Sequence, residues 1–464
     1  MAPEQVFQRL AGYPHVLFLD SALRHPELGR YSFVTVDPFE FLTIPADTSN
    51  GLAELQRRTR VYSTVSRSDL PPFQGGAAGL FGYELGRSLE RVPAARYDEF
   101  AVPAMALGFY DVVAAIDHVQ QRMWLVSQGF PESVPERRYH RARQRLEQLR
   151  RRLRDPSPAP PEDCQACTAS AFRLSRDELA PQFATSWSPQ LTSNFRAADY
   201  QAAIRRAVEY VRAGDIFQVN LSQRLLHPAD DSSVSLYLRL RRCNPATFAA
   251  YFDGGGFQVL SASPERFLQL RGSSVETRPI KGTRQRTSWP EADLFAADEL
   301  RQSEKDRAEN VMIVDLLRND LSRVCRPDSV RVSHLCDLEV YEYVQHLVSV
   351  VRGELDGGRT PVDLVRAAFP GGSITGAPKV RAMEIIAEIE PTARGAYCGC
   401  LGYLGFDGSV DLNILIRTIT ASRGWWQMPV GGGIVAQSNP QREYEETWHK
   451  AAGLLQALRK TSPS

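Results

Sequence analysis

Residues 306–321 have the sequence D-R-A-E-N-V-M-I-V-D-L-L-R-N-D-L, in which acidic and apolar residues recur at helical spacing. Residues three and four apart share one face of a helix, so Asp306 and Glu309 fall on the same face as Ile313 and Leu316. An ionised carboxylate on an apolar face is costly unless a cation or hydrogen-bond donors compensate for it. The stretch therefore predicts a helix whose first turns carry acids that need a partner.

A second pair of acids, Glu443 and Glu446, is also three residues apart at the start of a predicted helix. Two such pairs can jointly hold one hard cation through oxygen ligands, with water and substrate oxygens completing an octahedron. Alternatively, both pairs only compensate the dipoles of their helices. The spacing alone leaves both interpretations open.

The rest of the chain mixes helical and strand-like patterns. Helical periodicity occurs at residues 200–213, 299–324, 361–369, 379–389 and 444–458. Strand-like apolar runs occur at residues 16–19, 30–36, 105–116, 257–261, 267–270, 340–351 and 399–406. No fixed-period repeat and no regular strand-helix alternation is present, so the pattern predicts an α+β fold rather than a doubly wound sheet.

Length and composition narrow the class of protein. The 464 residues allow roughly three domains, or one large domain with a smaller partner. Apolar residues make up 43% and charged residues 23%, as in ordinary globular proteins, and the net charge of +1 gives no global field for nucleic acid or an anionic membrane. The acid at Glu4 makes the N-terminus a poor signal peptide. Pro103 and Asp111 interrupt the most apolar stretch, at 100–116, which is therefore a poor membrane span. We expect a cytoplasmic protein without a membrane segment.

The clearest boundary is the proline-rich segment 155–163, which predicts an extended linker between an N-terminal region at 1–154 and a catalytic domain at 193–464. Residues 137–154 contain nine arginines around an apolar stripe, and we interpret them as a surface helix. The seven cysteines are an odd number and do not suggest a disulfide framework. Cys164 and Cys167 have no second pair at zinc spacing, so we interpret them as ordinary thiols.

Several other groups could carry chemistry. Glycine-rich turns at 371–376, 395–402 and 431–433 expose backbone N–H groups that suit a carboxylate or phosphate, although none matches a P-loop or dinucleotide fingerprint. Lys281, in R-P-I-K-G-T-R, could act as a nucleophile if held in a partly dry site. His346 lies in a strand-like apolar run and could act as an acid or base. The ordinary alternatives are simple turns, an exposed lysine and a hydrogen-bonded core histidine.

Five motifs taken together resemble the chorismate-utilising enzymes. They are S-P-E-R-F at 263–267, T-R-P-I-K-G-T-R at 277–284, the helix at 306–321, G-S-I-T-G-A-P-K at 372–379 and G-G-G-I-V at 431–435. Weaker matches, L-F-L-D-S-A at 17–22 and G-G-A-A-G-L-F-G-Y at 75–83, extend the resemblance into the N-terminal region. The resemblance implies an α+β fold in which antiparallel sheets pack as a sandwich with helices outside.

The resemblance also implies which reaction of the family this chain catalyses. Members that add water to chorismate carry a lysine where this chain has Gln218, and anthranilate synthases usually carry alanine where it has Lys281. The resemblance therefore points to amination of chorismate at C4, giving 4-amino-4-deoxychorismate for p-aminobenzoate and folate synthesis. In that reaction the lysine is thought to attack C2 of the ring and eject the C4 hydroxyl, after which ammonia enters at C4.

Matching motifs carry further roles over to this chain. Glu309 and Glu446 resemble direct Mg²⁺ ligands, with Asp306 and Glu443 orienting metal-bound water, and Glu265 resembles the general acid for the departing hydroxyl. The residues that resemble carboxylate holders are Tyr397, Arg417, Gly432 and Gly433 for the substrate, with Gly282 and Thr283 for its enolpyruvyl group. His346 matches the histidine near the ring C1 proton in anthranilate synthases.

The resemblance implies partners as well. None of the cysteines lies in a nucleophile-elbow context, so a separate glutamine amidotransferase subunit is expected to supply ammonia. Asp20 and Ser21 match the location of a tryptophan pocket in the N-terminal region. Two alternatives stay in view: component I of an anthranilate synthase for tryptophan synthesis, and a non-catalytic tryptophan-binding regulatory subunit. The intact Glu265, Lys281 and metal-binding glutamates argue against the second alternative.

Overall fold

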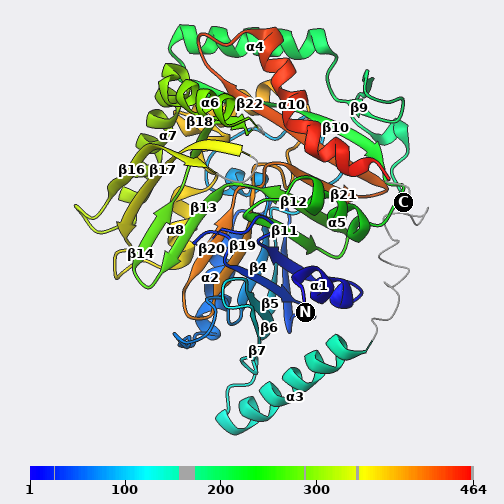
Figure 1. Ribbon diagram of the computed structural model, residues 1–464, viewed down its shortest axis with the longest axis vertical. Coiled ribbons are helices and arrows are strands. Elements are labelled where there is room, and N and C mark those ends of the chain that lie inside the picture. The colour runs from blue at the N-terminus through cyan, green and yellow to red at the C-terminus, as the bar shows by residue number, and fades with distance from the viewer. Residues whose placement is uncertain (26, 156–172, 287–288, 341–343, 461–464) are drawn as a thin grey trace.

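The structure is a computed structural model that describes residues 1–25, 27–155, 173–286, 289–340 and 344–460. Most of the predicted linker at 155–163, together with Cys164 and Cys167, lies outside the described residues. Within the described residues, no helix is long and apolar enough to cross a membrane. The chain forms two large antiparallel sheets with helices around them (Figure 1).

The first sheet has 12 strands, and it combines strands from both ends of the chain. In spatial order they are β7 (Arg122–Ser127), β6 (Val112–Asp117), β2 (Tyr31–Thr35), β1 (Leu17–Asp20), β11 (Phe248–Asp253), β12 (Phe257–Ser263), β21 (Thr418–Ser422), β22 (Trp425–Ile434), β10 (Gln218–Pro228), β9 (Thr192–Ser193) and β8 (Phe183–Ala184), with β18 (Gly376–Ala377) also paired to β10. The N-terminal strands join the rest where β1 pairs with β11.

The second sheet has 10 strands and is also shared between distant parts of the chain. In spatial order they are β15 (Ile280–Gln285), β17 (Val344–Glu354), β14 (Ser274–Thr277), β13 (Arg266–Arg271), β20 (Val410–Asn413), β19 (Cys400–Gly405), β4 (Gly76–Phe81), β5 (Met105–Tyr110) and β3 (Glu40–Ile44), with β16 (Arg331–Val340) paired to β17. Here the two halves join where β4 pairs with β19. The boundary predicted between residues 154 and 193 divides the sequence but not the sheets, since both sheets contain strands from each side of it.

Side chains alternate between two cores because successive residues of a strand point to opposite faces. On β5, Ala106 and Tyr110 pack in the layer between the sheets, whereas Met105, Leu107 and Phe109 pack on the outer face of the second sheet. This alternation lets one strand close the sandwich and also bury the helices outside it. The predicted α+β sandwich is confirmed.

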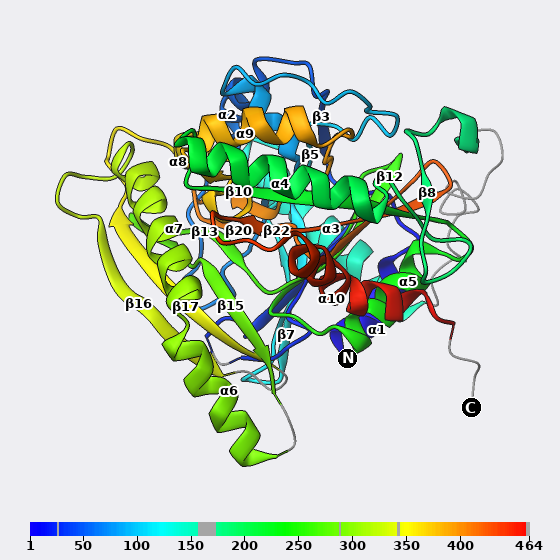
Figure 2. The same ribbon diagram turned by 90° about the horizontal axis from the view of Figure 1, so that it is seen from above.

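Helices cover the outer faces of both sheets. The helices are α1 (Pro3–Leu10), α2 (Gly51–Val61), α3 (Pro135–Arg154), α4 (Ala197–Ala213), α5 (Ser233–Cys243), α6 (Pro290–Gln302), α7 (Glu304–Ser322), α8 (Pro361–Ala368), α9 (Lys379–Ile389) and α10 (Pro440–Leu458). The helices α1, α3, α5 and α10 pack on the first sheet, and α2, α7 and α8 pack on the second. The helices α4 and α9 share a third core with β10, and they lie side by side when the molecule is seen from above (Figure 2).

The structure refines two predicted elements. The apolar run 105–116 is two strands, because the chain crosses from the second sheet to the first at the buried Asp111. The helical pattern at 299–324 includes the end of α6 and the whole of α7, which are separated at Ser303. The Ser303 side chain accepts a hydrogen bond from the Asp306 amide and so caps α7. Both breaks occur at polar residues: Ser303 caps α7, and Asp111 pairs with Arg145.

Candidate active site

Lys281 lies on β15 at the edge of the second sheet, beside α6 and α7. Strands β15 and β17 pair with Lys281 opposite Leu347 and Thr283 opposite His346, and the register shifts between these pairs. Gly282 sits in this irregularity with a φ of 73°. A Cβ there would be 2.7 Å from Cδ1 of Leu300 and 3.1 Å from Cγ of Asp306. Only glycine therefore lets the strand approach the two helices so closely.

Glu265 lies between β12 and β13 and is buried. Ser373 donates a hydrogen bond from its hydroxyl to Oε1 of Glu265 over 2.7 Å, and Nζ of Lys281 donates to the Ser373 carbonyl over 3.2 Å. Burial raises the pKa of Glu265 to about 7, although the Ser373 hydrogen bond and the Lys281 charge oppose that rise. Lys281 and Glu265, whose carboxyl group can hold its proton near neutral pH, therefore both lie beside Ser373.

The two predicted acidic pairs meet through a lysine. Nζ of Lys305 lies 3.3 Å from Oε1 of Glu443 on α10 and 3.9 Å from Oε1 of Glu309 on α7. Burial raises the pKa of Glu309, while the charges of Lys281 and Lys305 oppose the rise. The carboxylates at the starts of α7 and α10 therefore lie close together, and the charge of Lys281 acts on Glu309 as well.

Glu446 completes this group one turn further along α10. Burial favours its neutral form, but Lys450 outweighs burial and lowers the pKa of Glu446, with Lys305 and Lys281 adding to the effect. Nζ of Lys450 is 2.6 Å from Oε1 of Glu446. A Cβ on Gly432 would lie 3.4 Å from that same Oε1 atom, so the glycine-rich end of β22 forms a wall beside it.

The acids can be tested for their fit to Mg²⁺. In the described part of the chain, no three histidine, cysteine, aspartate or glutamate side chains form a ready-made metal cluster. Oε1 of Glu309 is nevertheless buried and has no hydrogen-bond partner there, which is costly for an ionised oxygen. Carboxylate oxygens are the donors that Mg²⁺ prefers. The residues therefore fit the ion, and Glu309 has an oxygen available for it.

Of the predicted carboxylate holders, Gly432 and Gly433 lie on β22, Tyr397 lies in a turn before β19, and Arg417 directly precedes β21. Burial lowers the pKa of Arg417, against the charges of Tyr397 and Glu446 that favour its charged form. Arg417 takes a left-handed backbone conformation with φ 52° and donates from Nη1 to the Lys450 carbonyl over 3.0 Å. A Cβ on Gly433 would be 2.6 Å from Nε2 of Gln218. Arg417 and the two glycines thus belong to the same neighbourhood as Glu446.

His346 lies beside these groups on β17. Burial and the Arg417 charge lower the pKa of His346 to about 4, against a hydrogen bond with the Gly282 backbone. The imidazole is therefore neutral at pH 7. Opposite it on β15 is Thr283, for which the structure describes the strand position alone. The histidine is thus close to the predicted lysine and to an arginine that can bind a carboxylate.

Three residues of the site were not singled out from the sequence: Ser373, Lys305 and Lys450. Ser373 lies in the glycine-rich turn at 371–376, for which the sequence predicts a role of the backbone N–H groups and not of the serine hydroxyl. Lys305 and Lys450 each lie four residues before or after a predicted metal-binding glutamate on a helix. That spacing puts a cation beside each acid and is the signal that could have identified them.

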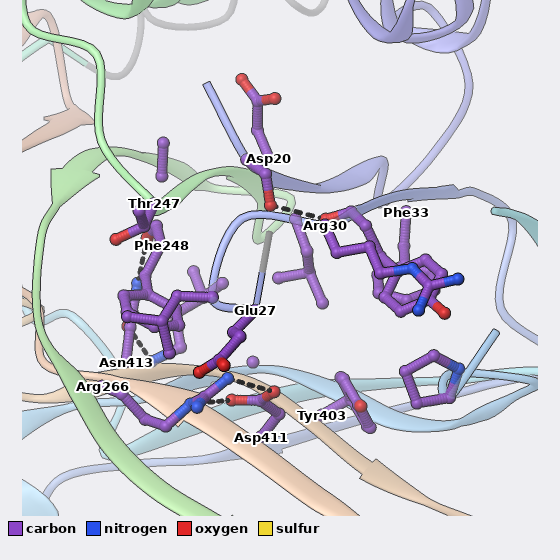
Figure 3. Close-up of a pocket in the computed structure, with 18 of the residues that line it drawn as sticks. Asp20, Glu27, Arg30, Phe33, Thr247, Phe248, Arg266, Tyr403, Asp411 and Asn413 are labelled. Atoms are coloured by element: carbon purple, nitrogen blue, oxygen red, sulfur yellow. Dashed lines mark hydrogen bonds and ion pairs between the residues drawn. The ribbon is translucent and has the colours of Figure 1, made fainter. Parts of the chain in front are cut away.

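A separate pocket lies between the two sheets at the predicted Asp20 and Ser21 (Figure 3). Asp20 is buried on β1, where it accepts hydrogen bonds from Nε of Arg241 over 2.6 Å and from the Tyr237 hydroxyl over 3.1 Å. Other lining residues come from the second sheet and include Arg266, Tyr403, Asp411 and Asn413. The pocket is thus built by both sheets.

Known proteins match this chain over most of its length. A family model described as "chorismate binding enzyme" matches residues 40–456. The chain is 39% identical to aminodeoxychorismate synthase component 1 of Salmonella typhimurium, over 98% of this chain and 96% of that protein. It is 38% identical to anthranilate synthase component 1 of Thermus thermophilus, over 98% and 95% of the two chains.

Solved structures show the same fold. Anthranilate synthase component I of Streptococcus pneumoniae superimposes with a TM-score of 0.77 at 30% identity, covering 93% of each chain. The menaquinone-specific isochorismate synthase of Escherichia coli gives a TM-score of 0.71 at 18% identity, covering 98% of this chain and 91% of that one. With a family model that spans most of its length and relatives of nearly equal length, this chain belongs to the family of chorismate-binding enzymes.

Proposed function

We propose that this chain is the synthase component of an aminodeoxychorismate synthase, which aminates chorismate at C4 to give 4-amino-4-deoxychorismate for p-aminobenzoate and folate synthesis. The position of Lys281 is the observation that carries the proposal. Its ammonium group is 3.2 Å from the Ser373 carbonyl, and its charge acts on Glu265, Glu309 and Glu446 alike. A nucleophile here is within reach of both the general acid and the acidic group.

In the first step Lys281 acts as the nucleophile after its ammonium group has given up a proton to solvent. Its nitrogen forms a bond to C2 of the ring while the C4–O bond breaks, and Glu265 gives its proton to the departing oxygen, releasing water. A carboxyl group with a pKa of about 7 suits this role because it still holds its proton near neutral pH. Holding the amine beside the ring replaces an encounter in solution with a high effective concentration.

The second step returns the lysine. Ammonia forms a bond to C4, the bond between C2 and the Lys281 nitrogen breaks, and the free amine is restored. The extra proton on the new C4 nitrogen passes to the Glu265 carboxylate, which becomes the acid again. The net reaction joins chorismate and ammonia and releases water. Mg²⁺, held by Glu309 and Glu446 with Asp306 and Glu443 around them, would supply a Lewis-acidic contact for the ring carboxylate. Arg417, Tyr397 and the amides near Gly432 and Gly433 would orient the substrate carboxylates, with Gly282 and Thr283 at the enolpyruvyl group.

Ammonia needs a source outside this chain. The relatives that it matches are named as component 1, which implies a second component, and we propose a glutamine amidotransferase subunit for that role. Purified chain supplied with an ammonium salt is expected to make product, and glutamine is expected to serve only after the partner is added. Turnover of glutamine by the isolated chain would contradict this assignment.

The experiment that tests the function is Lys281→Ala, with the products identified by chromatography. We expect the formation of aminodeoxychorismate to fall by roughly a thousandfold or more, because the covalent route is lost. Lys460→Met, which changes an exposed lysine that pairs with Asp230, is the matched control and should keep the wild-type rate. An unaffected rate in Lys281→Ala would exclude the covalent mechanism.

Anthranilate synthesis is the second candidate, because the relatives of that name match this chain equally well. His346 supports it, since a neutral imidazole near Lys281 could accept a proton from the ring. The two reactions are separated by the wild-type product. Fluorescent anthranilate formed without an added lyase would replace the proposal with this alternative.

We propose tryptophan as the occupant of the pocket at Asp20 and Ser21. Asp20 provides a carboxyl group, Arg30 and Arg266 provide positive charges, and Phe33 and Tyr403 provide aromatic surface for an indole ring. Such a mixture suits a zwitterion with a flat apolar side chain. Titration with L-tryptophan should raise the unfolding temperature, and L-alanine at the same concentration should not.

A further inference from the structure

Among the described residues, Lys305 is the lysine that forms ion pairs with acids at the starts of both α7 and α10. It is the second residue of α7, and its side chain is 48% exposed. Nζ is 3.3 Å from Oε1 of Glu443 and 3.9 Å from Oε1 of Glu309, and burial is outweighed by these acids, which raise the pKa of Lys305. Within the described part of the chain, its hydrogen bond and ion pairs are with carboxylates alone.

The second lysine of the site is held differently. Nζ of Lys450 pairs with Glu446 over 2.6 Å and also donates to the Gly431 carbonyl over 2.8 Å. A backbone carbonyl fixes the ammonium group at one point, so Lys450 stays in place whatever happens to the carboxylate. Lys305 has a flexible four-carbon stem, half in water, and only charge holds its end among the acids.

The two acids that Lys305 contacts are not equally satisfied. Oε1 of Glu443 accepts a hydrogen bond from the Ser438 hydroxyl over 2.7 Å as well as the bond from Lys305. Oε1 of Glu309 is buried without a hydrogen bond, and Lys305 is too far away to supply one. The lysine therefore offsets the charge of Glu309 but leaves its oxygen free for a stronger ligand.

From these contacts we propose that Lys305 is a built-in counter-ion that holds the acids of α7 and α10 in the metal-free protein and competes with Mg²⁺ for them. The inference rests on the Mg²⁺ site of the proposed function. Two positive charges close to the same carboxylates repel one another, so a bound divalent ion displaces the ammonium group toward water. The affinity of the site for Mg²⁺ is then reduced by the cost of that displacement. Lys305 is in this view a positioning residue that sets the metal concentration at which the site fills.

The test measures metal binding without chorismate. Wild type and Lys305→Met are titrated with MgCl₂ while the unfolding temperature is followed, and with MnCl₂ while free Mn²⁺ is followed by electron paramagnetic resonance. We expect Lys305→Met to have a lower unfolding temperature without metal and to half-saturate at a metal concentration roughly three- to tenfold lower. Lys305→Arg keeps the charge and should stay closer to wild type than Lys305→Met.

Lys460→Met is the matched control, because Lys460 is 53% exposed and lies 3.3 Å from a single carboxylate, that of Asp230. It should titrate as wild type. Equal or weaker metal binding by Lys305→Met would overturn the inference while leaving the proposed function intact. Formation of anthranilate by the wild type would overturn the proposed reaction without affecting the titration. A wild type that responds to neither metal would overturn both the inference and the metal site.

Discussion

The active site and the pocket between the sheets both contain buried carboxylates, but the partners of these carboxylates differ. In the pocket two acids have a close arginine: Arg241 is 2.6 Å from the buried Asp20, and Arg266 is 3.1 Å from the partly buried Asp411, a pair drawn in Figure 3. In the active site, Oε1 of Glu309 has no hydrogen bond. Matched pairs fix the shape of the pocket, whereas the unpartnered oxygen of Glu309 is available to a ligand. The comparison teaches that the acids of the two sites differ in their charge pairing and not only in their burial.

Among the carboxyl groups compared, the largest effect is expected from Glu265→Gln in the active site. The amide keeps the shape of Glu265 but cannot give a proton to the leaving oxygen, so kcat should fall by roughly 10²- to 10⁴-fold. Because the pKa of Glu265 is raised to about 7, the acid form is present below that pH, and the wild-type rate should decline as pH rises through it.

This decline is measured as kcat against pH with the concentration of free ammonia held constant. Glu265→Gln should lose the alkaline decline along with most of its rate. Glu147→Gln, which changes an acid that is 53% exposed on α3, is the control and should retain both. A wild-type profile that is flat between pH 6 and 8, a range of roughly one unit on either side of that pKa, would remove Glu265 from the acid role.

In the pocket the corresponding change is Arg241→Met, which leaves the buried Asp20 without its cation. The free energy of unfolding at pH 7 should fall by about 2–3 kcal/mol, since an unpaired buried carboxylate is costly. Burial already raises the pKa of Asp20 above its usual value, against the influence of Arg241, so the variant can recover part of the loss at low pH by protonating it.

The loss in Arg241→Met is measured by urea unfolding at pH 7 and pH 5, together with kcat. Arg67→Met, at the fully exposed pair with Asp69, is the matched control and should leave stability unchanged. Since Arg241 contacts none of the active-site residues, kcat should change by less than about twofold. A large loss of kcat with little loss of stability would contradict this prediction, because it would show that the Arg241–Asp20 pair of the pocket affects the active site.

Local patterns in the sequence predict the elements of this fold well. The helix predicted at 379–389 has the bounds of α9, and the acidic pairs do fall near the starts of α7 and α10. Such features depend on residues three or four apart, so a short window contains the whole signal. The motifs around Lys281 and Glu265 are local in the same sense.

What the sequence does not specify is which distant segments meet. Nothing local indicates that β4 pairs with β19, or that the run at 105–116 changes sheets at Asp111, where Arg145 of α3 pairs with the buried carboxylate over 3.2 Å. Residue spacing can place Lys305 beside Glu309, but it cannot show that Lys305 reaches Glu443 or that Ser373 reaches Glu265, because these partners are far along the chain. Their roles depend on tertiary packing, which residue spacing does not encode.

The smallest expected effect is that of Ser373→Ala, and it tests whether pairing tunes function within the active site itself. The Ser373 hydroxyl donates 2.7 Å to Oε1 of Glu265, and this hydrogen bond opposes the rise in the pKa of Glu265 that burial causes. Removing the hydroxyl should raise the pKa of Glu265 further, so the alkaline decline in kcat moves to higher pH. The rate at pH 7 should change by less than about threefold, because the proton donor remains. Ser322→Ala, at the exposed end of α7, should leave the profile in place. If the decline instead moved to lower pH, the hydrogen bond would be stabilising the protonated acid, and the contrast in charge pairing between the two sites would not extend to Glu265.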